Sequence, residues 1–142
     1  MQFDDKIGSI QQILTATNVG ILRRQAIVKE LNLKKGQTII DIGCGGGHLV
    51  EEISMCIGSS GRAIGVDPSE FQIKTAKERC KKLPNVQFLC SNASDINIDK
   101  NSCDAVTFTQ TLEYIDDVDE ALFVAKKLQK PKSIFVNIST LW

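Results

Sequence analysis

The stretch "IIDIGCGGGHLV", residues 39–50, decides the fold. Two isoleucines and Asp41 lead into Gly43, Gly45 and Gly47, and a helical pattern of apolar residues begins directly behind them. Glycine lets the backbone turn tightly and approach a ligand closely, and the first amides of a helix attract a negative group. A strand that ends in such a loop therefore predicts a nucleotide or nucleotide-like cofactor at this turn.

Short runs of β-branched residues alternate with helical patterns from residue 37 onward. Strands are expected at residues 38–42, 63–66, 86–90, 105–108 and 133–138. Ser69 and Asp117 each stand three residues before a Gln or a Glu, a spacing that predicts a capped helix start. This alternation predicts an α/β fold with a doubly wound, mostly parallel sheet that is covered on both faces.

The first 35 residues carry helical signals only. Ser9 and Gln12 have the spacing of a capping box, and a second helical segment ends at the break formed by Lys35 and Gly36. The apolar residues of this second segment that we expect to be buried are Leu22, Ala26, Ile27 and Leu31. We expect residues 1–35 to form an N-terminal helical cap on a domain of residues 36–142, together one compact unit.

The composition argues against several kinds of partner. Lys plus Arg and Asp plus Glu both number 17 in 142 residues, so no global charge attracts nucleic acid or an anionic membrane. No apolar run approaches the roughly 18 residues of a membrane span, and the first residues lack a signal-peptide pattern, so a cytoplasmic location is expected. Five scattered cysteines and the single histidine, His48, form no metal-binding pattern.

The spacing of the glycines distinguishes two ligand classes. A dinucleotide fingerprint, Gly-x-Gly-x-x-Gly, would place His48 where the third glycine must allow close helix packing. The pattern present is Asp41-x-Gly43-x-Gly45-x-Gly47. This pattern resembles motif I of the class I S-adenosylmethionine-dependent methyltransferases.

Further segments resemble the same family in the same order. Residues 63–69 resemble the end of its second strand, where an acid, here Asp67, binds both ribose hydroxyls. Residues 91–93 resemble its Gly-Asp-Ala segment, with Asn92 in place of the acid that holds the adenine amine. The cofactor-binding residues that the resemblance implies are Asp41, Gly43, Cys44, Gly45, Gly47, Asp67, Pro68, Asn92, Ala93, Thr109 and Gln110.

The resemblance implies a Rossmann-like methyltransferase fold with strand order 3-2-1-4-5, lacking strands six and seven. It implies S-adenosylmethionine as cofactor and methyl transfer to a small-molecule acceptor by in-line displacement, for which no catalytic residue is assigned. Two alternatives stay open: a cofactor-binding module or pseudoenzyme without turnover, and a nucleotide-dependent oxidoreductase, which His48 disfavours. The segment after the fourth strand lacks the Pro-Pro motif of base amino-methylases, and the region after motif I is closer to enzymes that act on quinones and sterols.

Several neighbouring side chains have two possible roles. Glu113 or Tyr114 is expected either to face the acceptor or to serve as a cap or core residue. His48 is expected to be a partly exposed residue at a helix start, and Cys44 to fill a small packed space within the loop. Arg23 and Arg24 are candidates for the cofactor carboxylate, but solvent is their expected destination.

The C-terminal part departs from the family. Residues 128–133 lack two glycines that usually precede the fifth strand, and the sequence stops at Trp142, whereas family members continue into another helix and a strand hairpin. We expect a fragment or a short form. Its fifth strand, residues 134–138, would then be an apolar edge that drives association into a homo-oligomer.

Overall fold

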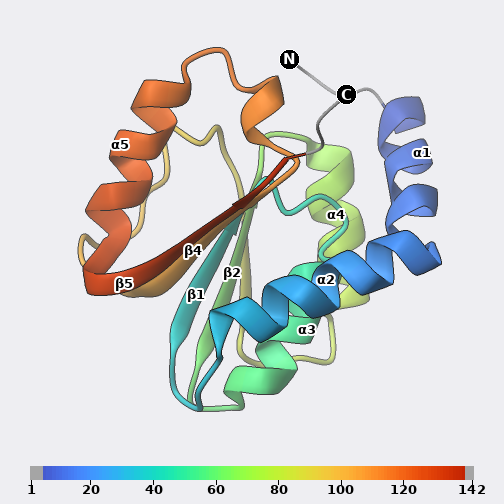
Figure 1. The fold of residues 1–142 in the computed structure, drawn as a ribbon. Coiled ribbons are helices and arrows are strands. Elements are labelled where there is room, and N and C mark those ends of the chain that lie inside the picture. The colour runs from blue at the N-terminus through green and yellow to red at the C-terminus, as the bar shows by residue number, and fades with distance from the viewer. Residues whose placement is uncertain (1–4, 140–142) are drawn as a thin grey trace.

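A computed structural model describes residues 5–139, so predictions about residues 1–4 and 140–142, Trp142 among them, lie outside the described residues. After two N-terminal helices, helices and strands alternate, except that the third strand is followed by the fourth without a helix between them (Figure 1). The elements are α1 (Asp5–Thr15), α2 (Asn18–Leu31), β1 (Thr38–Ile42), α3 (His48–Ile57), β2 (Arg62–Asp67), α4 (Glu70–Arg79), β3 (Val86–Cys90), β4 (Cys103–Thr109), the 3₁₀ helix η1 (Leu112–Tyr114), α5 (Val118–Leu128) and β5 (Gln129–Ile138).

The sheet has the strand order β3-β2-β1-β4-β5, and every neighbouring pair is parallel. This confirms the predicted order and the parallel topology. The central strand β1 is paired on both sides: Ile40 lies between Ile64 of β2 and Val106 of β4. Strand order reverses beside β1, so its carboxyl end is the place where a ligand is expected in such a sheet.

Helices cover both faces of the sheet, as the alternation predicts. Figure 1 shows α5 on one face and α2, α3 and α4 on the other. Each face has its own core: Ile39 and Ile53 belong to the side of α2 and α3, whereas Ile40 and Phe108 belong to the side of α5. None of the helices described is long and apolar enough to cross a membrane.

Two of the three predicted helix caps are confirmed. Ser69 Oγ accepts from Gln72 N at 3.3 Å at the start of α4, and Asp117 Oδ1 accepts from Glu120 N at 2.9 Å at the start of α5. The cap predicted at Ser9 is wrong because α1 begins at Asp5 and Ser9 lies inside it. There the Ser9 hydroxyl donates to the Asp5 carbonyl at 2.8 Å, the usual partner of a serine inside a helix.

Helix α2 buries a different stripe from the one predicted. Ile27 and Leu31 are buried as expected, but Leu22 is 65% exposed and Ala26 is exposed as well. The buried stripe instead includes Arg24, because its guanidinium pairs with Glu52 of α3 at 2.9 Å. Ile27 and Leu31 together with the Arg24–Glu52 ion pair therefore define the buried face of this helix.

Strand β5 is longer than predicted and forms one edge of the sheet. It begins directly after α5, and a register shift separates the Gln129–Cys103 pair from the Ile134–Ala105 pair, with the extra residues on β5. Its outer side has no partner strand within residues 5–139. Ile134 and Phe135 are 39% and 41% exposed, so the predicted apolar edge is present.

Candidate functional site

The glycine loop between β1 and α3 turns back onto β2. Gly43 N and Cys44 N both donate to the Val66 carbonyl, at 2.7 and 2.9 Å. Gly43, with φ at 79°, has a left-handed backbone conformation that favours glycine. A Cβ atom on Gly43 would also overlap the Thr111 side chain, which follows β4. The loop and the segment after β4 are therefore in direct contact only because residue 43 has no side chain.

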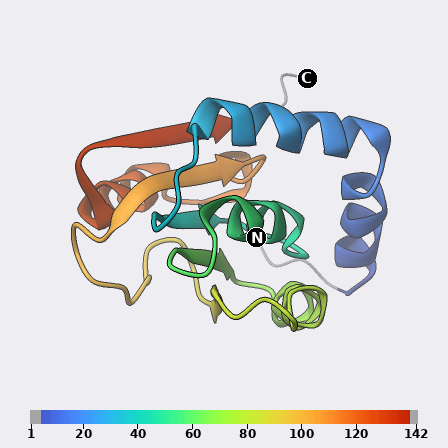
Figure 2. The same ribbon diagram turned by 90° about the horizontal axis from the view of Figure 1, so that it is seen from below.

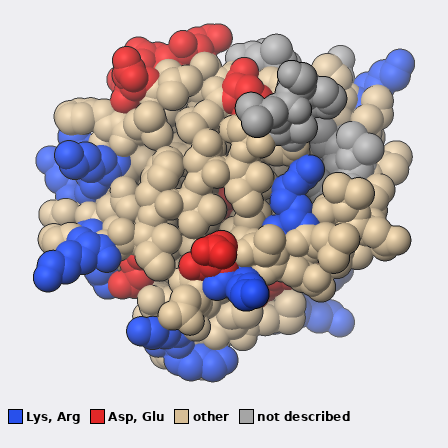
Figure 3. Space-filling view, viewed as in Figure 1, with Lys and Arg blue, Asp and Glu red and all other residues tan. Residues whose placement is uncertain are grey.

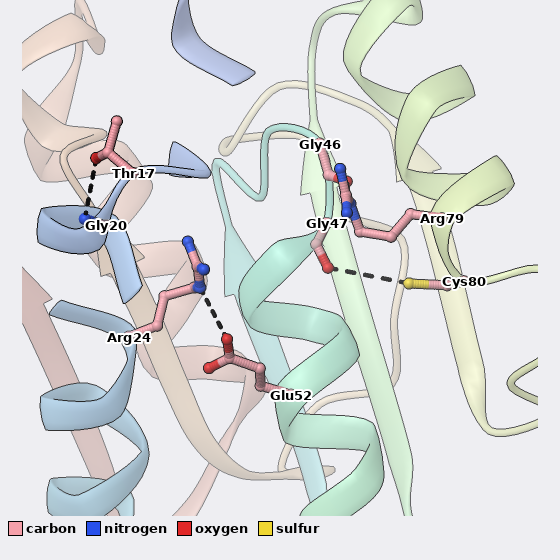
Figure 4. A network of polar contacts seen from close by, with 8 residues as sticks. All are labelled: Thr17, Gly20, Arg24, Gly46, Gly47, Glu52, Arg79 and Cys80. Carbon is pink, nitrogen blue, oxygen red and sulfur yellow. Dashed lines mark hydrogen bonds and ion pairs between the residues drawn. The ribbon is translucent and has the colours of Figure 1, made fainter. Parts of the chain in front are cut away.

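The end of α4 holds the loop from one side (Figure 4). Arg79 Nε at the end of α4 donates to the Gly46 carbonyl at 2.9 Å, and the Cys80 thiol lies 3.9 Å from the Gly47 carbonyl. On the other side the Arg24–Glu52 pair ties α2 to α3. The expectation that Arg24 points to solvent is wrong, because its side chain is buried and pairs with Glu52. Arg79 belongs to no sequence motif and was not predicted.

Asp67, at the carboxyl end of β2, accepts hydrogen bonds from the glycine loop and from the segment before α4. Its Oδ2 accepts from Gly45 N at 3.0 Å and its Oδ1 accepts from Ser69 N at 2.9 Å. Burial raises the pKa of this carboxyl, and the two amide hydrogen bonds oppose the rise. Each carboxylate oxygen still has a second acceptor position, so Asp67 can bind ligand hydroxyls while it holds the loop.

Asp41 lies behind the loop and is almost fully buried, with 2% of its surface exposed. The Thr107 hydroxyl on β4 donates to Asp41 Oδ1 at 2.7 Å. Burial raises the pKa of Asp41 to about 7, the Thr107 hydrogen bond lowers it in part, and the nearby Asp67 raises it further. A carboxyl group that titrates near neutral pH at the end of the central strand is typical of a functional site.

A cavity of about 290 Å³ opens at the loop and extends to the start of α5. Five of the predicted residues line it: Gly43, Asp67, Pro68, Asn92 and Ala93. The other predicted residues lie beside it and do not line it: Asp41, Cys44, Gly45, Gly47, Thr109 and Gln110. Sequence reasoning missed the contributions of Ile42, Val66, Ser91, Ser94, Thr111, Ile115, Asp116, Asp117 and Ala121.

Tyr114 and Glu113, considered together in the sequence, separate in the structure. Tyr114 lines the cavity on the same side as Asp116 and Asp117. Glu113 is exposed and accepts from the Ser139 hydroxyl at 3.4 Å, at the end of β5. The resemblance covered this stretch, but nothing in its spacing indicated which side chain turns inward.

The cavity is acidic. Three of its lining residues are Asp67, Asp116 and Asp117, and none of its described lining residues is Lys or Arg. Figure 3 shows Asp and Glu at the top, around the start of α5, and again in the lower middle of this face, whereas Lys and Arg are spread over its left, bottom and right. Such a cavity attracts a cationic ligand and repels a pyrophosphate.

Thr109 and Gln110 lie at the carboxyl end of β4, beyond the loop. Thr109 Oγ1 is buried and has no hydrogen-bond partner among the described residues. Gln110 N donates to the Ile138 carbonyl at 2.6 Å, and Gln110 Oε1 accepts from Arg23 Nη1 at 2.7 Å. Arg23 therefore reaches the site from α2, which overturns the expectation that it points to solvent.

His48 and Cys44 have roles close to those expected. His48 begins α3 and is partly exposed, and burial together with Arg79 and Arg24 lowers its pKa to about 4, so the ring is neutral. The Cys44 side chain is 8% exposed and packs close to Gly65. Burial raises the pKa of its thiol well above the ordinary value, which suits a packing residue and not a nucleophile.

Comparison with known proteins places these features in a family. A sequence model described as "Methyltransferase domain" matches residues 33–141. A demethylmenaquinone methyltransferase of Staphylococcus carnosus is 32% identical over 117 residues, and one of Staphylococcus aureus is 29% identical over 117 residues. Each match covers 82% of this chain and 48% of the relative, so the chain spans about half the length of these curated relatives.

Solved structures share the fold. A SAM-dependent methyltransferase from Aquifex aeolicus superposes with a TM-score of 0.84 at 25% identity, covering 96% of this chain and 72% of its own. A geranyl diphosphate C-methyltransferase from Streptomyces coelicolor, solved with S-adenosyl-L-homocysteine, has a TM-score of 0.73 at 21% identity. That match covers 82% of this chain and 43% of the other, and at this identity it supports the fold alone.

Proposed function

This chain belongs to the methyltransferase domain family, and we propose that it binds S-adenosylmethionine and transfers the methyl group to a small-molecule acceptor. The observation that carries the proposal is the acidic cavity that opens at the glycine loop. S-adenosylmethionine carries two positive groups, a sulfonium and an ammonium, and one negative carboxylate. Its net positive charge therefore suits a cavity that is lined by three aspartates. The pyrophosphate of a dinucleotide would meet the same aspartates without any lining cation, which disfavours an oxidoreductase.

The residues around the cavity fit the parts of this cofactor. Asp67, with Pro68 beside it, would bind the ribose hydroxyls, because each of its oxygens keeps one acceptor position. Asp41 would hold the ammonium group through the loop formed by Gly43, Cys44, Gly45 and Gly47 or by direct contact. The buried carboxyl gains an opposite charge there, which favours its ionised form.

The far end of the cavity would bind the adenine. Asn92 stands where the family has an acid, and its side-chain oxygen can accept from the adenine amine, with Ala93 alongside. Asp116 lines the same end of the cavity. We assign the charged acceptor for the adenine amine to Asp116, because the Asp117 carboxylate already caps α5. A charge-assisted hydrogen bond from Asp116 would compensate for the amide at Asn92.

The chemistry needs positioning more than acid–base catalysis. When bound, S-adenosylmethionine supplies a methyl carbon that would accept the acceptor's electron pair, while the pair of the broken S–C bond stays on sulfur and gives S-adenosylhomocysteine; the proton lost by a protonated acceptor would pass to solvent. Thr109 and Gln110 would line the place where donor and acceptor meet, at the end of β4. Alignment of the reacting atoms and exclusion of water are then the main contributions of the protein.

The acceptor that we propose is a quinol or another small molecule with a nucleophilic atom beside a ring oxygen. Two of the relatives are named for demethylmenaquinone, a quinone of this kind. We also propose that residues 1–35 act as a helical cap on the S-adenosylmethionine-binding domain of residues 36–142. A cytoplasmic location and association through β5 stay predictions.

Calorimetric titration with S-adenosylhomocysteine and with NAD tests the cofactor assignment. We expect binding of S-adenosylhomocysteine only, weakened about tenfold or more by Asp67→Ala and by Asp116→Asn, the loss of a charge-assisted contact. Asp119→Asn is the matched control, because Asp119 is exposed on the first turn of α5 and does not line the cavity. NAD binding without any response to S-adenosylhomocysteine would overturn the proposal.

Methyl release on a substrate panel separates the enzyme from a cofactor-binding module. The panel includes reduced demethylmenaquinone with a single isoprene unit, a sterol and a catechol. Turnover of the quinol supports the proposed acceptor class. Binding of S-adenosylhomocysteine with no transfer to any panel member favours the module without turnover.

A further inference from the structure

A side-chain bridge joins the N-terminal helices to the end of β4. Arg23 Nη1 on α2 donates to Gln110 Oε1 at 2.7 Å, across 87 residues of sequence. Figure 2 shows the arrowhead end of β5 next to α2, and the two elements are in contact. The Arg23–Gln110 hydrogen bond therefore connects α2 to the residue that directly follows β4.

Gln110 has an unusual backbone conformation. Its φ of 50° is left-handed, which costs a residue with a side chain roughly 1–2 kcal/mol. Gln110 N donates to the Ile138 carbonyl at 2.6 Å, so the backbone is held from β5 while the side chain is held from α2. Strained residues that surrounding contacts hold in place are found preferentially at functional sites.

The partner of Gln110 determines which way its amide faces. A guanidinium group only donates hydrogen bonds, so Arg23 must bind the amide oxygen. The amide nitrogen of Gln110 is then the end directed away from the Arg23 guanidinium. Arg23 thereby determines the direction in which the donor end of the Gln110 side chain, its amide nitrogen, faces.

Thr109, the residue next to Gln110, has a buried hydroxyl group that is not satisfied within the described part of the chain. Thr109 Oγ1 is buried and has no partner among the described residues, whereas buried hydroxyls in proteins are nearly always hydrogen-bonded. Thr109 lies at the carboxyl end of β4, beside the end of β1 that carries the glycine loop. A polar ligand group at this place would satisfy the Thr109 hydroxyl.

We propose that Arg23 is a positioning residue for methyl transfer, which holds the Gln110 amide so that it donates to an oxygen of the methyl acceptor. The inference rests on the proposed function, since the acceptor must lie where the end of β4 meets the cofactor. It deepens that function in two ways. The acceptor carries an oxygen close to its nucleophilic atom, and the helical cap sets the orientation in which that acceptor binds.

The first test removes the bridge and follows transfer. The variants are Arg23→Met, Arg23→Lys, Gln110→Ala and the double variant, with Lys29→Met as the matched control because Lys29 is exposed on the same helix. With reduced demethylmenaquinone carrying one isoprene unit, we expect Arg23→Met to lower kcat about tenfold, with S-adenosylhomocysteine affinity within about twofold of wild type. The kcat of Arg23→Lys should lie between the values for wild type and Arg23→Met. The kcat of the double variant should be no lower than that of Gln110→Ala.

The second test observes the Gln110 amide directly. In protein with nitrogen-15 glutamine, bound to S-adenosylhomocysteine, the side-chain NH₂ signals of Gln110 should be distinct from those of mobile amides. Gln110→Ala assigns these signals. We expect Arg23→Met to move them to the averaged positions of a mobile side chain and Lys29→Met to leave them unchanged.

The outcomes separate this inference from the proposed function. Transfer by the wild type that Arg23→Met and Lys29→Met leave equally intact overturns the role of Arg23 alone. Loss of S-adenosylhomocysteine binding in parallel with kcat identifies Arg23 as structural, which also overturns it. Should the wild type bind S-adenosylhomocysteine but not methylate this quinol, unchanged Gln110 signals in Arg23→Met overturn the inference and altered ones support it. A wild type that binds no S-adenosylhomocysteine overturns the proposed function itself.

Discussion

Strands β1 and β5 both carry isoleucines, but they differ in almost every physical respect. β1 is paired on both sides, and its residues from Ile39 to Ile42 are buried. β5 is paired on one side only, and Ile134 and Phe135 remain substantially exposed. The first strand carries the glycine loop and a buried acid, whereas the last carries one backbone contact to Gln110 and an open edge.

The difference shows how the molecule divides its tasks. The proposed cofactor site is built at the centre, where β2 and the end of α4 form hydrogen bonds to the glycine loop. The proposed acceptor side lies towards β5 and the helical cap, where fewer contacts constrain the chain. Central positions are therefore expected to tolerate change poorly, and edge positions to tolerate it well.

The largest expected effect is on stability at the centre of the sheet. Ile40→Ala should lower the free energy of unfolding by about 2–5 kcal/mol, because the side chain is fully buried between two strands and leaves a cavity. Ile134→Ala, at the edge, should cost less than about 1 kcal/mol, because 39% of that residue is already exposed. Urea denaturation measures both, and equal losses would contradict the distinction between centre and edge.

The second effect tests the loop at the end of the central strand. Gly43→Ala adds a methyl group that overlaps Thr111 and a left-handed strain, whereas Gly45→Ala adds the strain but meets no atom within 4 Å. We expect Gly43→Ala to cost about 1–3 kcal/mol more than Gly45→Ala, the usual range for overpacking. Gly43→Ala should also weaken the binding of S-adenosylhomocysteine more than Gly45→Ala does, since Thr111 lines the cavity.

A second change at Thr111 checks the cause. Thr111→Gly removes the side chain that the new methyl group would meet, so Gly43→Ala combined with Thr111→Gly should recover most of the extra loss. Stability is measured by urea denaturation and affinity by calorimetry. Failure of the combination to recover either quantity would show that backbone strain alone, and not the contact, requires glycine at residue 43.

The centre of the molecule could be predicted from the sequence because its signals are local. Asp41, Gly43 and Gly47 lie within seven positions of one another, next to a strand pattern and a helix pattern that fix their place. Asp67 follows the next strand, and parallel pairing brings the two strand ends together. These residues therefore meet in any sheet of this topology.

The remaining contacts could not be predicted because they join distant segments without a motif. Arg23 and Gln110 are 87 residues apart, and nothing in either segment indicates the other. The same holds for Arg79 and the Gly46 carbonyl. Helix α2 shows the limit of periodicity: its apolar pattern favoured Leu22, but the structure leaves Leu22 exposed and buries Arg24, which pairs with Glu52.

The third effect concerns pH at the buried acid of β1. The pKa of Asp41 is about 7 in the folded protein and 3.8 as an ordinary carboxyl, so folding favours the protonated form. The contribution of Asp41 to stability is complete below the unfolded pKa and is lost as pH rises towards 7. Between pH 3.8 and about pH 7 the free energy of unfolding therefore falls by up to roughly 1.4 kcal/mol per pH unit, the limit for one proton. Asp41→Asn should flatten this slope in urea denaturation.

The same group should make cofactor binding pH-dependent in the opposite sense. In the role proposed for Asp41, the ionised carboxylate would hold the ammonium group, so affinity for S-adenosylhomocysteine should rise about tenfold between pH 6 and pH 8, as follows from a pKa near 7. His48, with a pKa of about 4, stays neutral throughout this range and does not contribute. In Asp41→Asn the affinity should be lower and flat. An equally steep rise in that variant would assign the dependence to another group, such as Asp67.

The smallest effect on stability, and the sharpest contrast with the centre, is expected at the edge itself. Unpaired strand edges with apolar flanks tend to pair with a second chain, and a lysine there prevents it. Ile134→Lys should leave the free energy of unfolding within about 1 kcal/mol of wild type while abolishing association at high protein concentration. Leu22→Lys is the control, because Leu22 is equally apolar and 65% exposed but lies on α2. Sedimentation over a wide concentration range separates the two: if the wild type stays monomeric, or if Leu22→Lys dissociates it as well, the open side of β5 does not drive assembly.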